Sequence, residues 1–390
     1  MKTKRALPLL FAVMFFVMIG FGIIIPVLPF YAEELGASPT ELGLLMAVYS
    51  IMQLIFAPMW GRISDRIGRK PVITIGILGL SLSFFLMAFA NSLWMLFAAR
   101  IFGGFLSSAN MPTAMAYVAD ITSEEDRGKG MGIIGAAVGL GFVFGPAIGG
   151  IFSKGSLSTP FYIAGISSLV TTIFVLLFLK ESLSLGQKEK SQQKASRWQS
   201  FKGPLSVLYV LQLFVSLSLS GLEATFAYFA AKTAGLGTLE LGYIFMIMGF
   251  AGALVQGGLV GRLTKKFGEG PVIQMGIFVS AIGFFLILFV DNFVTAAIFL
   301  SVFGIGNGVI RPSVSSLLTK KSDTGHGNTT GLLSSMDSLG RVIGPPLGGI
   351  LYSISIGLPY ISGILLSLIA LLLYRFYVGI DSKQTALSLE

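Results

Sequence analysis

Five charged residues lie inside long apolar stretches of the sequence, where a charge is costly and needs a partner or a function. They are Arg100, Glu223, Arg311, Asp337 and Arg341. Carboxylates in such places bind and release protons, and guanidinium groups pair with carboxylates. The residue types therefore indicate proton and ion chemistry within a membrane.

Glu223 is the candidate proton-binding residue. No basic residue lies within four positions of it. Burial without a partner favours the neutral, protonated form of a carboxyl group, which makes proton exchange accessible. The alternative is a glutamate that stays permanently protonated or hydrogen-bonded. We favour proton exchange because intramembrane acids are functional by default.

The other four charges each have two interpretations. Asp337 and Arg341 are four residues apart and can pair on one helix face, either as a structural ion pair or with a role in proton coupling. Arg100 either lines a cavity or donates hydrogen bonds to carbonyl groups. Arg311 lies nearer the end of its stretch, where a long basic side chain can also serve as an anchor.

Polar residues at helical spacing accompany these charges. Three stripes follow this spacing: Gln212, Ser216, Ser220 and Glu223; Thr330, Ser334, Asp337 and Arg341; and Asn307, Arg311 and Ser315. We expect such stripes to face a water-filled cavity rather than lipid. The expected substrate cavity is lined by Arg100, Asn110, Phe142, Gln212, Phe226, Asn307, Arg311 and Arg341.

The composition requires a membrane. Hydrophobic residues make up 54% of the chain, charged residues 12%, and the mean hydropathy is +0.84. A soluble domain carries about a quarter charged residues. With no cysteine and one histidine (His326), the chain has little basis for a metal site or a catalytic constellation. No GxxxxGK[ST] run is present, so neither ATP nor another cofactor is expected.

Apolar stretches long enough to cross a bilayer predict twelve helices. They lie near 7–30, 41–60, 71–90, 93–118, 129–152, 159–180, 204–230, 239–260, 271–290, 293–318, 327–352 and 357–376. Most Lys and Arg residues then fall in the loops on the N-terminal side, and only Lys154 and Lys232 fall in the opposite loops. This asymmetry predicts a multi-pass cell-membrane protein with both termini cytoplasmic, and it explains the net charge of +9 without a nucleic acid partner.

The chain contains an internal duplication. GRISDRIGRKPVI (61–73) returns as GRLTKKFGEGPVI (261–273), and GFVFGPAIGG (141–150) returns as GRVIGPPLGG (340–349). Glycines at every fourth position of the second motif allow another helix to approach closely. We predict an all-α polytopic membrane protein of two pseudo-symmetric six-helix bundles, residues 1–180 and 204–390, joined by a cytoplasmic basic linker at 181–203.

Four motifs resemble those of the major facilitator superfamily, in order and on the corresponding helices. They are IGFGIIIPVLPFY (19–31), GRISDRIGRK (61–70), ARIFGGFLSSANMP (99–112) and GFVFGPAIGG (141–150). The first is similar to the helix 1 motif of twelve-helix drug/proton antiporters, the tetracycline and quinolone exporters among them. The resemblance implies a cytoplasmic latch at Gly61, Asp65, Arg66, Gly68 and Arg69, and an antiporter motif at Gly141, Gly145, Pro146, Gly149 and Gly150.

The sequence thus predicts a monomeric, proton-coupled antiporter that exports hydrophobic, often cationic, small molecules by alternating access. Glu223 and Asp337 are its expected proton-coupling residues. One alternative is a proton-coupled symporter that imports a small metabolite. An intramembrane enzyme is disfavoured because the one histidine lies in a loop. A receptor or scaffold with a transporter fold is the remaining alternative.

Overall fold

The computed structural model describes residues 2–183, 205–321 and 326–387 of the 390-residue chain. Every regular element in these ranges is a helix. The chain divides into two compact units: unit 1 comprises Met1–Gln192 and Leu236–Met246, and unit 2 comprises Gln193–Gly235 and Ile247–Glu390. Residues 184–204 of the expected linker lie outside the described ranges.

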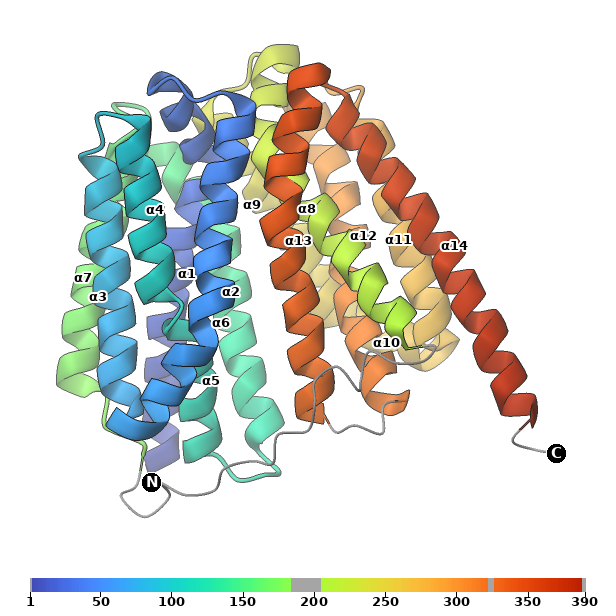
Figure 1. The fold of residues 1–390 in the computed structure, drawn as a ribbon, viewed down its shortest axis with the longest axis horizontal. Coiled ribbons are helices and arrows are strands. Elements are labelled where there is room, and N and C mark those ends of the chain that lie inside the picture. The colour runs from blue at the N-terminus through green and yellow to red at the C-terminus, as the bar shows by residue number, and fades with distance from the viewer. Residues whose placement is uncertain (1, 184–204, 322–325, 388–390) are drawn as a thin grey trace. The chain divides into compact units, whose positions relative to one another are not determined.

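The helices follow one another along the chain with short connections (Figure 1). Before the expected linker these are α1 (Lys2–Glu34), α2 (Pro39–Ile67), α3 (Arg69–Ala88), α4 (Leu93–Ser107), α5 (Asn110–Ile121), α6 (Arg127–Phe152) and α7 (Thr159–Phe178). After it come α8 (Ser206–Ala234), α9 (Thr238–Leu254), the π-helical turn η2 (Val255–Leu259), α10 (Val260–Phe267), α11 (Glu269–Ile287), α12 (Phe293–Lys321), α13 (His326–Ile354) and α14 (Leu358–Leu387).

Ten helical segments within the described ranges are long and apolar enough to cross a membrane, with α9, η2 and α10 counted as one segment. The two further spans expected from the sequence correspond to α4 with α5, which is divided into two pieces, and to α13, which carries Asp337 and Arg341. A polytopic all-α membrane protein, the fold class that the sequence indicates, is confirmed.

Two of the expected spans are not continuous α-helices. The span expected at 93–118 ends at Ser107 and restarts at Asn110. In the span expected at 239–260, the α-helix gives way to the π-helical turn η2, which contains Gly257 and Gly258. Hydropathy detects neither change because an interrupted helix keeps its apolar composition.

Glycines let α1 and α6 approach at backbone distance in unit 1. A Cβ placed on Gly145 would lie 2.7 Å from the carbonyl oxygen of Ile19 and 2.6 Å from the Cα of Gly22. Gly141 and Gly149 meet the backbone of α1 in the same way. The close approach expected of this glycine row is confirmed.

The repeated glycines do the same for α8 and α13 in unit 2. A Cβ on Gly344 would lie 2.5 Å from the carbonyl oxygen of Leu217, and one on Gly348 would lie 3.0 Å from that of Gly221. The duplication has therefore preserved one helix pairing in both units. It has also placed the backbone of α13 within reach of polar side chains on α8.

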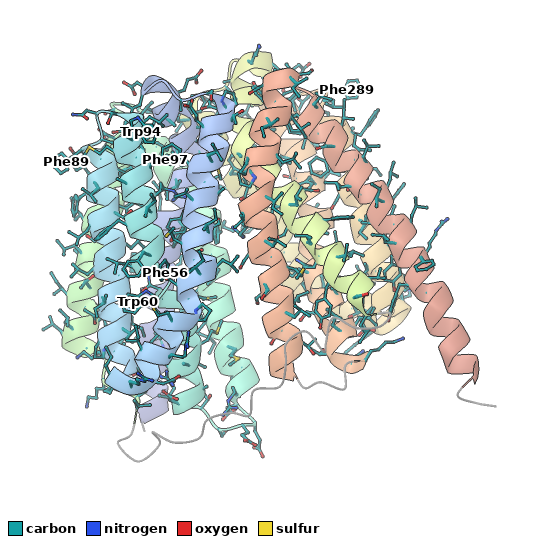
Figure 2. The ribbon with its side chains drawn as sticks, viewed as in Figure 1. Phe56, Trp60, Phe89, Trp94, Phe97 and Phe289 are labelled. Carbon is teal, nitrogen blue, oxygen red and sulfur yellow. The ribbon has the colours of Figure 1, made fainter. Side chains whose placement is uncertain are left out.

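Large exposed aromatic residues mark the ends of several helices. Phe89, Trp94 and Phe97 lie together at one end of unit 1, and Phe289 lies at an end of unit 2 (Figure 2). Trp94 is 82% exposed, Phe89 62% and Phe289 59%. The amphipathic ring of Trp94 at such a position is typical of the membrane–water interface.

We predict that Gly145→Val destabilises the protein because the added methyl groups would force α1 away from α6. A loss of about 1–3 kcal/mol is expected for overpacking of this kind. The measurement is thermal unfolding of the purified protein in detergent. Gly139→Val is the matched control on α6, because nothing lies within 4 Å of a Cβ there. Equal losses in the two variants would contradict the proposed role of the close contact.

Candidate functional site

Glu223 has no partner on α8. Its side chain is half-buried, whereas its neighbours along the helix, Leu222 and Ala224, are buried. Within the described ranges, no hydrogen bond or ion pair ends on its carboxyl group. The charge of Arg341, on α13, acts on it through space. A carboxyl group in this setting can take up a proton or attract a cation.

Asp337 is the centre of a polar cluster that joins three helices of unit 2. Its Oδ1 accepts hydrogen bonds from Gln212 Nε2 at 2.6 Å and from Ser216 Oγ at 3.2 Å, both on α8. Its Oδ2 lies 2.8 Å from Nη2 of Arg311 on α12. The Asp337 side chain is only 14% exposed. Its charge is therefore compensated from two neighbouring helices.

The expected pairing of Asp337 with Arg341 is wrong. Both residues lie on α13 at the right spacing, but Asp337 pairs with Arg311, which the sequence predicts to be a cavity or anchoring residue. Hydrogen bonds from α8 fix the orientation of the Asp337 carboxylate, so that it cannot also turn toward Arg341. Arg341 is left exposed, without an ion pair in the described part of the chain.

The polar stripe of α8 packs against α13 instead of facing a cavity. Gln212, Ser216 and Ser220 are 2%, 7% and 3% exposed. The hydroxyl of Ser220 donates to the carbonyl oxygen of Gly340 at 3.0 Å. The prediction of a cavity-facing stripe is therefore wrong for these three residues, Gln212 included. The glycines of α13 bring polar groups close enough to replace water as their partners.

Arg100 ties α4 to α2 inside unit 1. It is 6% exposed, and its Cζ lies 4.2 Å from the centroid of the Tyr49 ring, close enough for a cation–π interaction. Its Nε donates to the carbonyl oxygen of Leu45 at 3.4 Å. The Tyr49 hydroxyl bonds Ser107 and accepts a hydrogen bond from Gln53 at 3.2 Å. The hydrogen-bonding interpretation of Arg100 is confirmed, and its expected place in an open cavity is wrong.

Asn110 is buried at the start of α5, where the span expected at 93–118 is interrupted. It is 3% exposed and packs so tightly against Gly76 of α3 that a Cβ there would collide with its amide oxygen. Neither amide atom has a partner in the described ranges, nor does the hydroxyl of Thr113 one turn later. The expected cavity position of Asn110 is wrong because its side chain lies within the bundle.

The remaining expected cavity residues have different surroundings. Phe226 is fully buried, which leaves it no surface for a substrate, whereas Phe142 is half-buried on α6. Asn307 lines a small cavity of about 20 Å³ inside unit 2, together with the hydroxyl side chains of Ser218 and Ser280. Among the charged candidates, the side chains of Arg311 and Arg341 are exposed.

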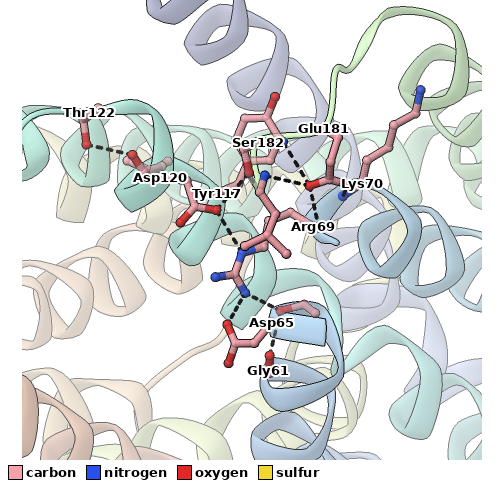
Figure 3. Close-up of polar contacts among 12 residues, drawn as sticks. Gly61, Asp65, Arg69, Lys70, Tyr117, Asp120, Thr122, Glu181 and Ser182 are labelled. Atoms are coloured by element: carbon pink, nitrogen blue, oxygen red, sulfur yellow. Dashed lines mark hydrogen bonds and ion pairs between the residues drawn. The ribbon is translucent and has the colours of Figure 1, made fainter. Parts of the chain in front are cut away.

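Arg69 organises a second polar cluster where α2, α3 and α5 end (Figure 3). It is 7% exposed, and its Nη1 donates to Asp65 Oδ1 at 2.6 Å and to Ser64 Oγ at 2.7 Å. Its Nε donates to Asp120 Oδ2 at 3.0 Å. The Asp65 side chain itself is 61% exposed. The latch role that the resemblance implies for Asp65 remains a prediction.

Glu181, which follows α7 in the sequence, caps the N-terminus of α3. Its carboxylate accepts hydrogen bonds from the backbone nitrogens of Arg69 at 2.8 Å and Lys70 at 3.1 Å. A negative charge at this position is favoured by the helix dipole. Gly68, with φ of +112°, leaves the space that the carboxylate occupies, and a Cβ there would collide with it.

The second copy of this motif keeps the turn and reverses the charges. Gly268, 200 residues after Gly68, has φ of +82° and begins α11 as Gly68 begins α3. Glu269 occupies the position of Arg69, and it forms an ion pair with Lys320, which occupies the position of Asp120. The corresponding helices, α3 with α5 in unit 1 and α11 with α12 in unit 2, are thus joined by ion pairs of opposite polarity.

The other residues of the latch and antiporter motifs lie near the end of α2 or within α6. Nothing lies within 4 Å of a Cβ on Gly61, so no close contact requires a glycine there among the described residues. Arg66 is exposed at the end of α2. Pro146 and Gly150 are buried within α6. The functional roles that the resemblance implies for the latch and antiporter motifs remain predictions.

Three residues of these clusters were missed by sequence reasoning: Tyr49, Asp120 and Glu181. Asp120 and Lys320 could have been found by aligning the two halves, because opposite charges stand 51 residues after Arg69 and after Glu269. Tyr49 and Glu181 have no comparable signal. In the described ranges, no group of three or more His, Cys, Asp or Glu residues is placed to hold a metal ion.

Comparisons with known proteins give a family match over most of the chain. Residues 10–330 and 259–389 match the family model described as Major Facilitator Superfamily. The chain is 31% identical to Multidrug resistance protein 1 of Bacillus subtilis over 360 residues and 30% identical to Multidrug resistance protein 2 over 367, covering 92% of each chain. It is 29% identical to Quinolone resistance protein NorA of Staphylococcus aureus over 359 residues, covering 91% of this chain and 92% of that one.

Solved structures share the fold at lower sequence identity. The nucleoside transporter NupG superposes with a TM-score of 0.79 at 14% identity, covering 97% of this chain and 99% of that chain. The human organic anion transporter MFSD10 superposes with a TM-score of 0.70 at 22% identity, covering 96% and 100%. These likenesses concern the fold alone.

We predict that Gly68→Ala is more destabilising than Gly268→Ala. Both substitutions place a side chain at positive φ with ψ near 160°, a backbone region essentially restricted to glycine, which costs about 1–3 kcal/mol of folding free energy, but only the first displaces the Glu181 cap. Loss of a helix cap adds about 1 kcal/mol. Thermal unfolding provides the measurement. In a Glu181→Ala background the two glycine substitutions should have similar effects, and a persistent difference would contradict the capping role.

We also predict that the Glu269–Lys320 pair tolerates reversal. Glu269→Lys and Lys320→Glu each place like charges together, and each should lower the free energy of unfolding by about 1 kcal/mol, since Lys320 is largely exposed. The double variant should recover most of that loss. Additive losses in the double variant, measured by thermal unfolding at low salt, would show that the pair contributes nothing.

Proposed function

Because the chain belongs to the Major Facilitator Superfamily, whose members are multi-pass membrane transporters of small molecules, we propose that it is a drug/proton antiporter. Its substrates are hydrophobic, often cationic, small molecules that it exports by alternating access. The multidrug and quinolone resistance proteins that match over about nine-tenths of its length support this substrate class.

The observation that carries the proposal is the unpaired, half-buried carboxyl group of Glu223. When deprotonated it attracts a cationic substrate, and when protonated it releases that substrate. Because a proton and a substrate compete for one group and both bias the same two-state motion, the flux of one drives the flux of the other. No second ligand or prosthetic group is needed for this exchange.

The proton gradient is the proposed energy source, without ATP. A membrane potential supplies about 2.3 kcal/mol per charge per 100 mV. A cycle that moves one net positive charge inward would therefore support roughly a 50-fold concentration gradient of substrate. A one-for-one exchange of a proton for a monovalent cation moves no net charge and is driven by the pH difference alone. We further propose that the protein works as a monomer in the cell membrane with both termini in the cytoplasm, which places the Arg69 cluster at the cytoplasmic surface.

Asp337 is the proposed second proton-coupling residue. Its carboxylate is held by Arg311, Gln212 and Ser216, so protonation would weaken the ion pair that links α13 to α12. Glu223 and Asp337 thus have different tasks: the first binds proton or substrate, and the second changes how helices of unit 2 are held together.

We predict that Glu223→Gln abolishes proton-driven export while the protein still folds, because the amide is similar in size and cannot exchange a proton. The measurement is efflux of a fluorescent lipophilic cation from energised membrane vesicles, with and without an uncoupler. Glu33→Gln, at an exposed position near the end of α1, is the matched control and should export as the unmodified protein does. Undiminished, uncoupler-sensitive efflux by Glu223→Gln would overturn the proposal.

A further inference from the structure

A small cavity in unit 2 lies among four membrane-spanning helices. Its volume is about 20 Å³, and its lining comes from α8, α11, α12 and α14. Most of the lining is apolar and includes Phe284 and Phe303, which are 2% and 1% exposed. A cavity needs about 10–15 Å³ to hold one water molecule. The space is therefore large enough for a single water and far too small for a drug-sized substrate.

Four polar side chains also line this cavity, one from each helix. They are Ser218 on α8, Ser280 on α11, Asn307 on α12 and Ser367 on α14. Each carries a group that donates or accepts hydrogen bonds. An apolar cavity stays dry, whereas a water in a polar one typically makes about three hydrogen bonds. The lining therefore supplies enough partners for one water.

Three of the four polar groups have no hydrogen-bond partner in the part of the chain that the structure describes. Ser280 is only 4% exposed, and its hydroxyl oxygen is unpaired there. The half-buried side chains of Ser218 and Asn307 also form no hydrogen bond with described residues. The Ser367 hydroxyl donates to the carbonyl oxygen of Gly363 at 2.8 Å and keeps its lone pairs as acceptors. Because an unpaired polar group is costly inside a membrane protein, these side chains require a ligand in the cavity.

Close contact between α11 and α12 prevents the cavity from collapsing. A Cβ on Gly306 would lie 2.5 Å from the backbone nitrogen of Ser280 and 2.6 Å from its hydroxyl oxygen. A Cβ on Gly283 would lie 2.5 Å from the Cα of Phe303. The two helices are already at backbone distance on both sides of the Ser280 hydroxyl. They cannot move closer to fill the space or to give this hydroxyl a direct partner.

We infer that the cavity binds one water molecule, which links α8, α11 and α12 by hydrogen bonds to Ser218, Ser280 and Asn307. A bridging water of this kind is nearly as favourable in enthalpy as a direct hydrogen bond. Asn307 precedes Arg311 by one helical turn, and Arg311 pairs with Asp337 on α13. The water therefore extends to α11 the polar contacts that join α8, α12 and α13. The inference is independent of the proposed function.

Radiolytic labelling tests for the water directly. X-ray irradiation of a bound water produces hydroxyl radicals, which oxidise the side chains beside it even where these are buried. The purified full-length protein is irradiated in detergent, and oxidation of individual phenylalanines is followed by mass spectrometry. Phe284 and Phe303 should be oxidised several-fold faster than Phe161 and Phe226, which are fully buried and do not line the cavity. Equal rates in the two pairs would overturn the inference.

Two variants remove partners of the water from different helices. Asn307→Leu replaces the amide by an apolar group of similar size, and Ser280→Ala removes the unpaired hydroxyl. Each should lower the oxidation of Phe284 and Phe303 toward the rate of the two reference rings. Undiminished oxidation in both variants would contradict the assigned site.

A matched control comes from the same helix as Asn307. Ser301 lies on α12 outside the lining, and its hydroxyl donates to the carbonyl oxygen of Ala297 at 2.6 Å. Ser301→Ala should therefore leave the labelling unchanged. A variant that lost its fold would be recognised by faster oxidation of Phe226 and by its thermal unfolding, so loss of the water and loss of the fold give opposite results.

Discussion

A charged group within a bilayer has no water to solvate it, and this constraint accounts for most of the polar arrangement in the chain. Asp337 is satisfied by groups from α8 and α12. Arg100 is satisfied by the Tyr49 ring and a backbone carbonyl. Glu223 and Arg341 are the exceptions, since neither has a hydrogen bond or an ion pair among the described residues. Function is best sought where the local structure leaves a charge unsatisfied.

The duplicated halves share backbone geometry and differ in chemistry. Each half has a glycine-lined helix pair, α1–α6 in the first and α8–α13 in the second. Each half also has a turn with positive φ, at Gly68 in the first and at Gly268 in the second. Side chains at equivalent positions have diverged, as in the Arg69–Asp120 pair and its reversed counterpart Glu269–Lys320. Asp65 has a role in the first copy, where it binds Arg69, and no equivalent in the second, where Glu269 has replaced that arginine. A conserved scaffold can therefore carry an asymmetric distribution of charge.

The same glycines that pack the helices also organise the proposed site. Because α13 approaches α8 closely, Ser216 and Ser220 bond to it, and Gln212 reaches Asp337. Asp337 is thereby withdrawn from Arg341. Packing and function are linked in this way: a bulkier residue at Gly344 would separate the helices and release both the polar stripe and the acid that it holds.

The sequence by itself determined the class of the protein, the positions of most spans, the duplication and the identity of the unpaired acid Glu223. These properties follow from composition, periodicity and local spacing, all of which are written along the chain. Only the tertiary structure decided which charges meet. Asp337 pairs with Arg311 and not with Arg341. Arg69 binds Asp120 through its side chain and Glu181 through its backbone nitrogen. Asn110 and Phe226 are buried. These contacts depend on how helices far apart in sequence are rotated and how closely they approach. The spacing of residues along one helix carries no information about either.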